Sequence, residues 1–392
     1  MDRLASELRR LTALQQPAWA DPPDRARAAL AARAPLVPGT EILRLRAELA
    51  SVARGERLVV QAGDCAESPD DSAAADVRAK RGLLRLLADE LAAATGRPVL
   101  RVGRIAGQYG KPRSQDHETV GGRRLPVYRG HLVNRPEPDP GRRRADPANL
   151  LRCHDAARQV LDHLDDQHRD EDVPPAERVR TSHEALLLDY ELPQLREESG
   201  QALLTSTHWP WVGERTRQPD GAQIALLAAV ANPVAVKVGP GTDPHDLLDL
   251  CRRLDPDREP GRLTLVARMG RDLVGPRLPA LVTAVRRAGH PVVWLTDPMH
   301  GNTVVTPDGF KTRLLDTVVA EVCGFLAAVH EGGGVPGGLH LETTPDEVTE
   351  CVDDEDALDR VPHKYLTLCD PRLTPGQAAR VIGAWAGPDG RS

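Results

Sequence analysis

PVAVKVGPGTDPHDLLDLCRRLDPDREPGRLTLVAR, residues 233–268, holds two short apolar runs with an amphipathic stretch between them. The runs at 233–239 and 262–268 are continuously apolar apart from one or two cations, which is typical of parallel strands buried on both faces. Between them, residues 243–255 place leucines at three-to-four spacing, which predicts a helix. The stretch therefore predicts a β-α-β unit.

The same alternation extends in both directions. Eight apolar runs are candidate strands: RLVVQAG (57–63), PVLRVGR (98–104), QALLTST (201–207), PVAVKVG (233–239), RLTLVAR (262–268), PVVWLTD (291–297), GGLHLET (337–343) and YLTLCD (365–370). Further helical patterns lie at 278–289, 310–329 and 344–352. Eight repeats predict a closed (β/α)8 TIM barrel, with an open doubly wound sheet as the alternative.

Two regions interrupt this rhythm. Residues 1–56 carry helical patterns, LASELRRLTAL (4–14) and TEILRLRAELASVARG (40–55), and are predicted to form a helical extension before a catalytic barrel at 57–392. This extension is expected either at a subunit interface or across the bottom of the barrel. A long polar loop is expected within 105–150, followed by a helix at 149–164.

Charge and cysteine content narrow the class of protein. The chain has 51 basic and 57 acidic residues, a net charge of −6, which argues against nucleic acid or an anionic membrane as its main partner. Its six cysteines are dispersed without a CxxC pair, and its first residues lack an apolar signal core. We expect a cytoplasmic protein.

Potential metal ligands follow several predicted strands. In a barrel the carboxyl ends of the strands form the active face, and the last strand borders the first. A thiol, an imidazole and two carboxylates would then share one arc of that face: Cys65, His300, Glu342 and Asp370. Such a donor set predicts a divalent metal site without selecting among manganese, cobalt, iron and zinc.

Cations collect at the remaining strand ends, namely Arg104, Arg215, Lys237 and Arg268. Only five of the 51 basic residues are lysines, and two more of them, Lys111 and Lys311, fall in loops on the same face. Solvated surface charge is the alternative reading, but Lys237 interrupts an apolar strand, where an unpaired charge would be costly. Together the two arcs predict metal-assisted chemistry on phosphorylated substrates.

At these residues the sequence resembles the class II 3-deoxy-D-arabino-heptulosonate 7-phosphate (DAHP) synthases. The matching motifs run in order along nearly the whole chain: QAGDCAES (61–68), RVGRIAGQYGKPRS (101–114), LPVYRGHLVN (125–134), TSHEALLLDYE (181–191), WVGERTR (211–217), NPVAVKVGP (232–240), GRLTLVARMG (261–270), DPMHGNT (297–303), GFKTR (309–313) and CDPRL (369–373).

The resemblance implies a transferase that condenses phosphoenolpyruvate with erythrose 4-phosphate at the start of the shikimate pathway. It implies a divalent cofactor, Mn²⁺ or Co²⁺ before Zn²⁺ or Fe²⁺, held by the four metal candidates, and a homo-oligomer, expected as a dimer. The implied substrate-binding residues are Arg104, Lys111, Ser114, Glu214, Arg215, Lys237, Arg268 and Lys311. The implied catalytic residues are Lys237, Glu214 and His300.

The chain departs from the family pattern in two places. His131 stands where an aspartate is expected after Tyr-Arg-Gly, so a contact near the sugar is expected to differ. The connection between 149–164 and TSHEALLLDYE is short, which predicts weak or absent feedback inhibition by tryptophan or phenylalanine and a short form serving specialised, phenazine-type metabolism. The alternatives are an amino-variant synthase acting on an imino-erythrose phosphate and a non-catalytic phosphate-binding barrel.

Overall fold

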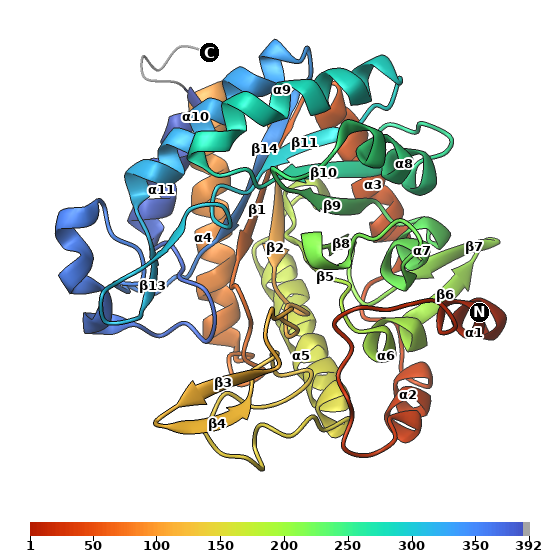
Figure 1. Cartoon of the computed structure of the whole chain (residues 1–392). Coiled ribbons are helices and arrows are strands. Elements are labelled where there is room, and N and C mark those ends of the chain that lie inside the picture. Colours follow the sequence, from red (N-terminus) through yellow and green to blue (C-terminus); the bar gives the residue numbers. More distant parts are fainter. Residues whose placement is uncertain (387–392) are drawn as a thin grey trace.

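The computed structural model describes residues 1–386, and its centre is a closed barrel of eight parallel strands (Figure 1). In order around the barrel these are β1 (Leu58–Gly63), β2 (Val99–Arg104), β5 (Arg180–Glu184), β8 (Trp209–Val212), β9 (Val234–Val238), β10 (Leu263–Ala267), β11 (Val293–Thr296) and β14 (Pro336–Glu342). β14 pairs with β1 and closes the ring, placing Glu342 level with Gly63. The predicted TIM barrel is confirmed, and the open sheet is wrong.

Helices surround the strands (Figure 1). They are α4 (Ala74–Thr95), α5 (Ala148–Asp170), α6 (Leu188–Glu191), α7 (Ala222–Ala229), α8 (Pro244–Leu254), α9 (Arg271–Arg287), α10 (Leu315–Glu331) and α11 (Pro375–Gly383). The predicted helix α8 shows why they form: the Asp243 side chain accepts a hydrogen bond from the His245 N–H at the N-cap. Leu247, Leu250 and Leu254 of α8 are buried.

Two of the eight predicted strands are wrong. Residues 201–204 form β7 (Gln201–Leu204), which pairs with β6 (Leu195–Glu198) in a hairpin outside the barrel. Residues 365–370 are an irregular loop, and residues 344–352, predicted as a helix, are also irregular. The barrel uses β5 and β8 instead.

Strand β5 was not predicted because its buried side chains are polar and form hydrogen bonds with side chains outside the strand. Ser182 Oγ accepts a hydrogen bond from Gln61 Nε2 at 2.9 Å, and Thr181 Oγ1 lies 2.9 Å from His208 Nδ1. Hydrogen bonding makes their burial tolerable. Strand β8 contains Pro210, which removes a backbone donor.

The remaining segments are short. The predicted loop at 105–150 contains a hairpin of β3 (His117–Val120) and β4 (Arg123–Pro126), which projects from the barrel in Figure 1. A second hairpin joins β12 (Thr303–Val305) and β13 (Lys311–Arg313). The 3-10 helices are η1 (Pro175–Glu177), η2 (Leu192–Gln194), η3 (Glu214–Thr216), η4 (Glu355–Lys364) and η5 (Ala384–Ala386).

The N-terminal helices are α1 (Asp2–Leu8), α2 (Asp24–Ala31) and α3 (Gly39–Ala53). Leu45 and Leu49 of α3 are fully buried in a core cluster with strand residues, and α3 touches Gly261 and Gly337 at the amino ends of β10 and β14. Of the two expected locations, α3 therefore takes the barrel bottom.

The division at residue 56 remains a prediction, and residues 387–392 of the predicted barrel lie outside the described residues. Within residues 1–386, no helix has the length and apolar character needed to cross a membrane.

Candidate active site

A cavity of about 680 Å³ opens at the carboxyl ends of the barrel strands. Loops after β2, β8, β10 and β11, together with β9, contribute to its walls. All of the predicted substrate-binding residues line it: Arg104, Lys111, Ser114, Glu214, Arg215, Lys237, Arg268 and Lys311. Tertiary structure thus brings together side chains that span more than half of the sequence.

His300, Glu342 and Asp370 form one cluster at this cavity. One ligand atom from each lies within 4.8 Å of the others, and His300 Nε2 is 3.3 Å from Glu342 Oε1. One imidazole nitrogen and two carboxylate oxygens suit a divalent transition metal, so the residues present fit the ion that the sequence predicts.

Cys65 lies beside this cluster but outside the three-residue group. Its Sγ accepts a hydrogen bond from the Asp370 backbone N–H at 3.2 Å and lies 3.5 Å from Thr367 Oγ1. Asp370 comes from an irregular loop, not from an eighth strand as predicted. A bridge between Thr343 and Leu373 keeps that loop beside the end of β14.

Cations surround the two carboxylates. Asp370 pairs with Lys111 at 2.7 Å and with Lys311 at 2.8 Å, while Arg313 pairs with Glu342 at 2.9 Å. Burial alone would raise the pKa of Glu342, but His300, Lys111 and Arg313 outweigh it and hold this pKa well below its usual range. The pKa of Asp370 is likewise lowered, against the effect of burial, mainly by Lys111. Both groups are therefore ionised, as metal ligands must be.

Asp297 joins Lys237 to His300. Its fully buried carboxylate lies 2.6 Å from Lys237 Nζ and 2.8 Å from His300 Nδ1, which leaves His300 Nε2 facing Glu342. Lys237 Nζ also lies 4.6 Å from the centre of the Trp211 ring. Asp297 was not predicted as a site residue, although its position three residues before His300 in the motif Asp-Pro-Met-His could have indicated it.

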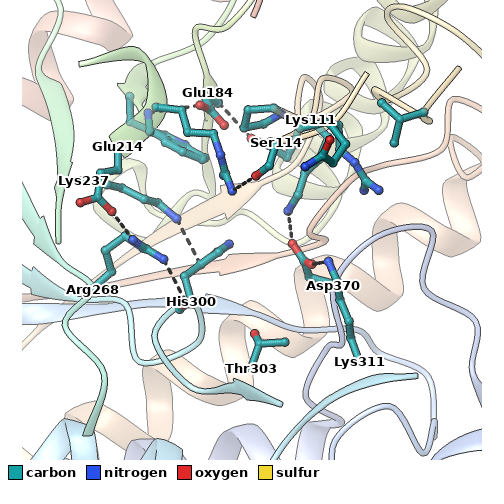
Figure 2. A pocket seen from close by; sticks show the side chains of 18 of the residues that line it. Lys111, Ser114, Glu184, Glu214, Lys237, Arg268, His300, Thr303, Lys311 and Asp370 are labelled. Carbon is teal, nitrogen blue, oxygen red and sulfur yellow. Dashed lines mark hydrogen bonds and ion pairs between the residues drawn. The ribbon is translucent and has the colours of Figure 1, made fainter. Parts of the chain in front are cut away.

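The remaining predicted cations form further pairs. Arg268 pairs with Glu214 and donates to the His300 carbonyl at 2.9 Å, and Arg215 donates to Ser114 Oγ at 2.8 Å. In Figure 2, Lys237 and Arg268 gather near His300, whereas Lys111 and Lys311 gather at Asp370. The cavity therefore has two cationic regions, one on either side of the cluster of His300, Glu342 and Asp370.

Arg104 lies deeper than the other cations. Its side chain is 1% exposed, and it donates to the Asp64 carbonyl at 3.0 Å and to Glu342 Oε1 at 3.1 Å. It also lies 2.6 Å from His340 Nε2. Arg104 thus forms the floor of the cavity and supports Glu342.

Glu184 and Trp211 line the cavity but were not predicted. They stand at or near the carboxyl ends of β5 and β8, the two strands that sequence patterning missed. Burial raises the pKa of Glu184, although Lys237 and Lys111 oppose this, and its carboxylate accepts the Gly213 N–H at 3.2 Å.

His131 lies outside the large cavity. Its Nδ1 lies 2.7 Å from Tyr128 Oη, and its side chain lines a separate cavity with Asp64 and Asp70. The large cavity is not lined by His131, so the structure gives no support to an altered contact of this side chain near the sugar, which stays a prediction. Its burial lowers its pKa.

Comparison with known proteins assigns this architecture to a family. A sequence model of the Class-II DAHP synthetase family matches residues 4–172 and 166–383. The chain belongs to this family. A probable phospho-2-dehydro-3-deoxyheptonate aldolase from Pseudomonas fluorescens is 52% identical over 389 residues, covering 98% of this chain and 97% of that protein. As a class II DAHP synthetase, the chain is an enzyme of the first step of the shikimate pathway.

Other phospho-2-dehydro-3-deoxyheptonate aldolases also match this chain over most of its length. A phospho-2-dehydro-3-deoxyheptonate aldolase from Streptomyces coelicolor is 40% identical over 422 residues, covering 94% of both chains. One from Mycolicibacterium smegmatis is 39% identical over 427 residues, covering 93% of this chain and 90% of that one. A solved phospho-2-dehydro-3-deoxyheptonate aldolase from Francisella tularensis, 13% identical with a TM-score of 0.53, covers 95% of this chain and all of that one and supports the fold alone.

Proposed function

We propose that the large cavity condenses phosphoenolpyruvate with erythrose 4-phosphate and water to give DAHP and phosphate. The observation that carries this proposal is the meeting of the His300, Glu342 and Asp370 cluster with many cations in one cavity of about 680 Å³. The lining cations are Arg104, Lys111, Arg113, Arg215, Lys237, Arg268 and Lys311. Two phosphorylated substrates repel each other unless such groups neutralise them.

We propose that each of the two cationic regions binds one of the two substrates. We assign phosphoenolpyruvate to Arg104, Lys237 and Arg268 with the Glu214-Arg215 loop. Lys237 and Arg268 contact His300, Glu214 pairs with Arg268, and Arg104 lies at the floor of the cavity beside Glu342. We assign the phosphate of erythrose 4-phosphate to a second set, near Asp370 and the loop after β2: Lys111, Ser114, Arg215 and Lys311. Arg215 lies where the two sets meet.

We assign the metal to Cys65, His300, Glu342 and Asp370, with Mn²⁺ or Co²⁺ expected before Zn²⁺ or Fe²⁺. When bound, a divalent ion there supplies Lewis acidity toward the aldehyde oxygen of erythrose 4-phosphate. The mixed thiolate, imidazole and carboxylate donors support a transition metal but do not select one.

In the reaction, C3 of phosphoenolpyruvate bonds to the aldehyde carbon, and the aldehyde oxygen gains a proton to become a hydroxyl. Water adds at C2 and loses a proton, which balances the one gained by the aldehyde oxygen. The hemiketal phosphate then breaks its C2–O bond to phosphate, and its hydroxyl proton leaves with the phosphate. We assign three catalytic residues. Lys237 neutralises the anion beside the reacting carbons, Glu214 takes the proton of the attacking water, and His300 holds the metal. The buried Asp297 supports both Lys237 and His300 in these roles.

The test adds erythrose 4-phosphate to purified protein, phosphoenolpyruvate and each metal in turn, and follows loss of the enol absorbance. We expect activity that chelation abolishes, a Cys65→Ala enzyme that binds metal more weakly, and a Lys237→Ala enzyme with a raised KM for phosphoenolpyruvate. Lys364→Ala, at an exposed lysine, is the control. Full activity after exhaustive chelation would contradict the metal site, and an unchanged KM in Lys237→Ala would contradict the anion site.

The alternative functions have less support. The imino-substrate reading depended on His131, which faces another cavity. Turnover of the aldehyde compared with the imine would separate the two enzymes. The non-catalytic barrel is wrong, because the chain belongs to an enzyme family.

We also propose that this is a short form with weak or absent feedback inhibition, serving specialised, phenazine-type metabolism. Its support is that the alignments with the Streptomyces and Mycolicibacterium relatives run over 422 and 427 positions, more than the 392 residues of this chain. Those relatives therefore contain residues that this chain lacks. If 1 mM tryptophan or phenylalanine halves the activity, the proposal is contradicted. That concentration is chosen because enzymes typically have KM values for metabolites of up to about 1 mM.

We further propose a cytoplasmic homodimer. Six unpaired cysteines support the reducing compartment. The dimer follows from the family resemblance alone. Sedimentation equilibrium of the full chain tests it, and a monomer at enzyme-assay concentrations would contradict it.

A further inference from the structure

Glu321 is a fully buried carboxylate on α10, outside the barrel and behind the active-site loops. Its Oε1 accepts the backbone N–H groups of Met269 and Gly270, each at 2.9 Å. Its Oε2 accepts the Asn302 side-chain amide at 2.5 Å. The carboxylate thus binds two loops, one after β10 and one after β11.

Asn302 extends the connection between these loops. Its Oδ1 accepts the Arg271 backbone N–H at 3.0 Å, and its Nδ2 also donates to the Pro298 carbonyl at 2.8 Å. Glu321 and Asn302 together therefore contact both loops through five hydrogen bonds.

The loops carry one proposed substrate cation and one proposed metal ligand. Arg268 begins the first loop and His300 lies in the second, and Arg268 Nη2 donates to the His300 carbonyl at 2.9 Å. A displacement of one loop against the other would therefore change the distance between the anion-binding guanidinium and the imidazole.

The two loops also meet backbone to backbone. A Cβ on Gly301 would lie 2.3 Å from Gly270 N, and Gly270 has a φ of +82°. No side chain separates the loops at this point. Their spacing is fixed on the cavity side by the bond from Arg268 to the His300 carbonyl and from behind by Glu321 and Asn302.

The chemistry of Glu321 is unusual for a purely structural group. Within residues 1–386 no lysine, arginine or histidine forms an ion pair with it. Burial raises its pKa to about 7, although the N–H groups of Gly270 and Met269 lower it. An apolar side chain in place of Glu321 would leave the Met269 and Gly270 N–H groups and the Asn302 amide without this acceptor, so the carboxylate is what ties both loops to α10.

We propose that Glu321 is a positioning residue that sets the spacing of Arg268 and His300, and so couples phosphoenolpyruvate binding to metal binding. This inference rests on the proposed function. Glu321 does not line the cavity and does not belong to the cluster of His300, Glu342 and Asp370, so it acts only through the two loops.

The test is the Glu321→Gln enzyme. The substituted side chain keeps one acceptor oxygen, but its amide nitrogen faces the Asn302 amide, donor against donor. We expect about a tenfold weaker Kd for Mn²⁺ and about a tenfold higher KM for phosphoenolpyruvate, the size of one lost charge-assisted hydrogen bond. At saturating Mn²⁺, the KM for erythrose 4-phosphate should change by less than about threefold. Three of its proposed ligands, Lys111, Ser114 and Arg215, lie on other loops, and the fourth, Lys311, lies on the β12–β13 hairpin beyond Asn302.

Glu331→Gln, on an exposed glutamate of the same helix, is the matched control and should leave all three constants unchanged. Calorimetric titration with MnCl₂ and with phosphoenolpyruvate measures binding without turnover. If the Glu321→Gln enzyme does not fold, the Asn302→Ala enzyme tests the inference instead. This variant keeps the Glu321 carboxylate and its two backbone partners, Met269 and Gly270. It should raise both the Kd for Mn²⁺ and the KM for phosphoenolpyruvate.

A folded variant that has a lower Tm but binds Mn²⁺ and phosphoenolpyruvate as the wild type does would overturn the inference. An equal rise in all three constants would also overturn it, since general loosening would explain that result. The proposed function fails separately, when the wild-type enzyme itself shows no metal-dependent condensation.

Discussion

Asp297 shows how one buried side chain prepares two neighbours at once. Its carboxylate bonds to Lys237 and to the ring of His300, and these two hold its pKa well below the usual range although burial opposes them. A carboxylate on the second nitrogen of a metal-binding histidine fixes the ring orientation and tautomer. Asp297 therefore supports the proposed metal site and the proposed anion site together.

We predict that Asp297→Asn weakens Mn²⁺ binding by about 10- to 100-fold, the usual effect of losing such a partner. It should also lower the free energy of unfolding by about 3 kcal/mol, because Lys237 is left buried without its counter-ion. Calorimetric titration and urea denaturation measure the two effects. Wild-type Mn²⁺ affinity in the variant would refute the support of His300.

Buried histidines predict acid sensitivity. Burial, aided by Arg81, lowers the pKa of His168 to about 4, and its Nε2 accepts the Val179 N–H at 3.2 Å. The unfolded chain, with a histidine pKa of about 6.5, binds the proton more readily than the folded one. This contribution to stability is complete above pH ~6.5 and is lost as the pH falls toward ~4.

We therefore expect the free energy of unfolding to fall between pH 7 and pH 5, and to fall less in His168→Gln, which retains an acceptor for Val179. Denaturation in urea at both values measures the difference. His363→Gln, at an exposed histidine, is the control. An identical pH dependence in wild type and His168→Gln would rule out this assignment.

At the scale of elements, Gly301 and Gly82 differ in how much room they leave for a side chain. Gly301 lies where two active-site loops cross, with Gly270 backbone atoms in the space a Cβ would take. Gly82 lies exposed inside the helix α4, and a Cβ there meets nothing within 4 Å. The first glycine permits contact between loops, whereas the second only lowers helix propensity.

We expect Gly82→Ala to stabilise the enzyme by about 1 kcal/mol with unchanged kinetics. Gly301→Ala should destabilise it by about 2 kcal/mol and raise the KM for phosphoenolpyruvate, because the loops must separate. Thermal unfolding and steady-state kinetics of both variants test the pair. Normal kinetics in Gly301→Ala would show that the loops tolerate separation.

At the scale of the whole molecule, the N-terminal segment reaches the active face as well as the barrel bottom. Gln15 Oε1 accepts the Arg113 N–H at 2.8 Å, and Gln16 Oε1 accepts the Leu188 N–H at 3.0 Å. Trp19 Nε1 donates to Asp189 at 2.8 Å. Gln15 therefore supports the loop that carries Lys111, and Gln16 and Trp19 fix this segment to α6.

Deleting residues 1–19 should raise the KM for erythrose 4-phosphate more than the KM for phosphoenolpyruvate, because the Arg113 loop loses its acceptor. Deleting only residues 1–10 keeps Gln15 and is the control. Steady-state kinetics at saturating metal measure both constants. Equal constants in the two truncated enzymes would show that residues 12–19 do not support the loop.

The barrel and about half of the residues that line the cavity could be predicted from the amino-acid sequence. Parallel strands buried on both faces are mostly apolar, and six of the eight barrel strands could be predicted from this pattern. Cations such as Lys237 were noticed because they interrupt such runs. Glu342 ends β14 and His300 lies in the loop after the neighbouring strand β11, so the order of the strands predicted that they meet.

The other features depend on the folded chain. Strand β5 is polar and buried because its partners, Gln61 and His208, come from other strands and loops. The loop of Asp370 reaches the metal cluster through a bridge to β14, and Glu321 bonds loops that lie 19 to 52 residues away. Hydrogen bonds between side chains and distant backbone leave no periodic pattern in a sequence, because they depend on which loops the closed barrel brings together.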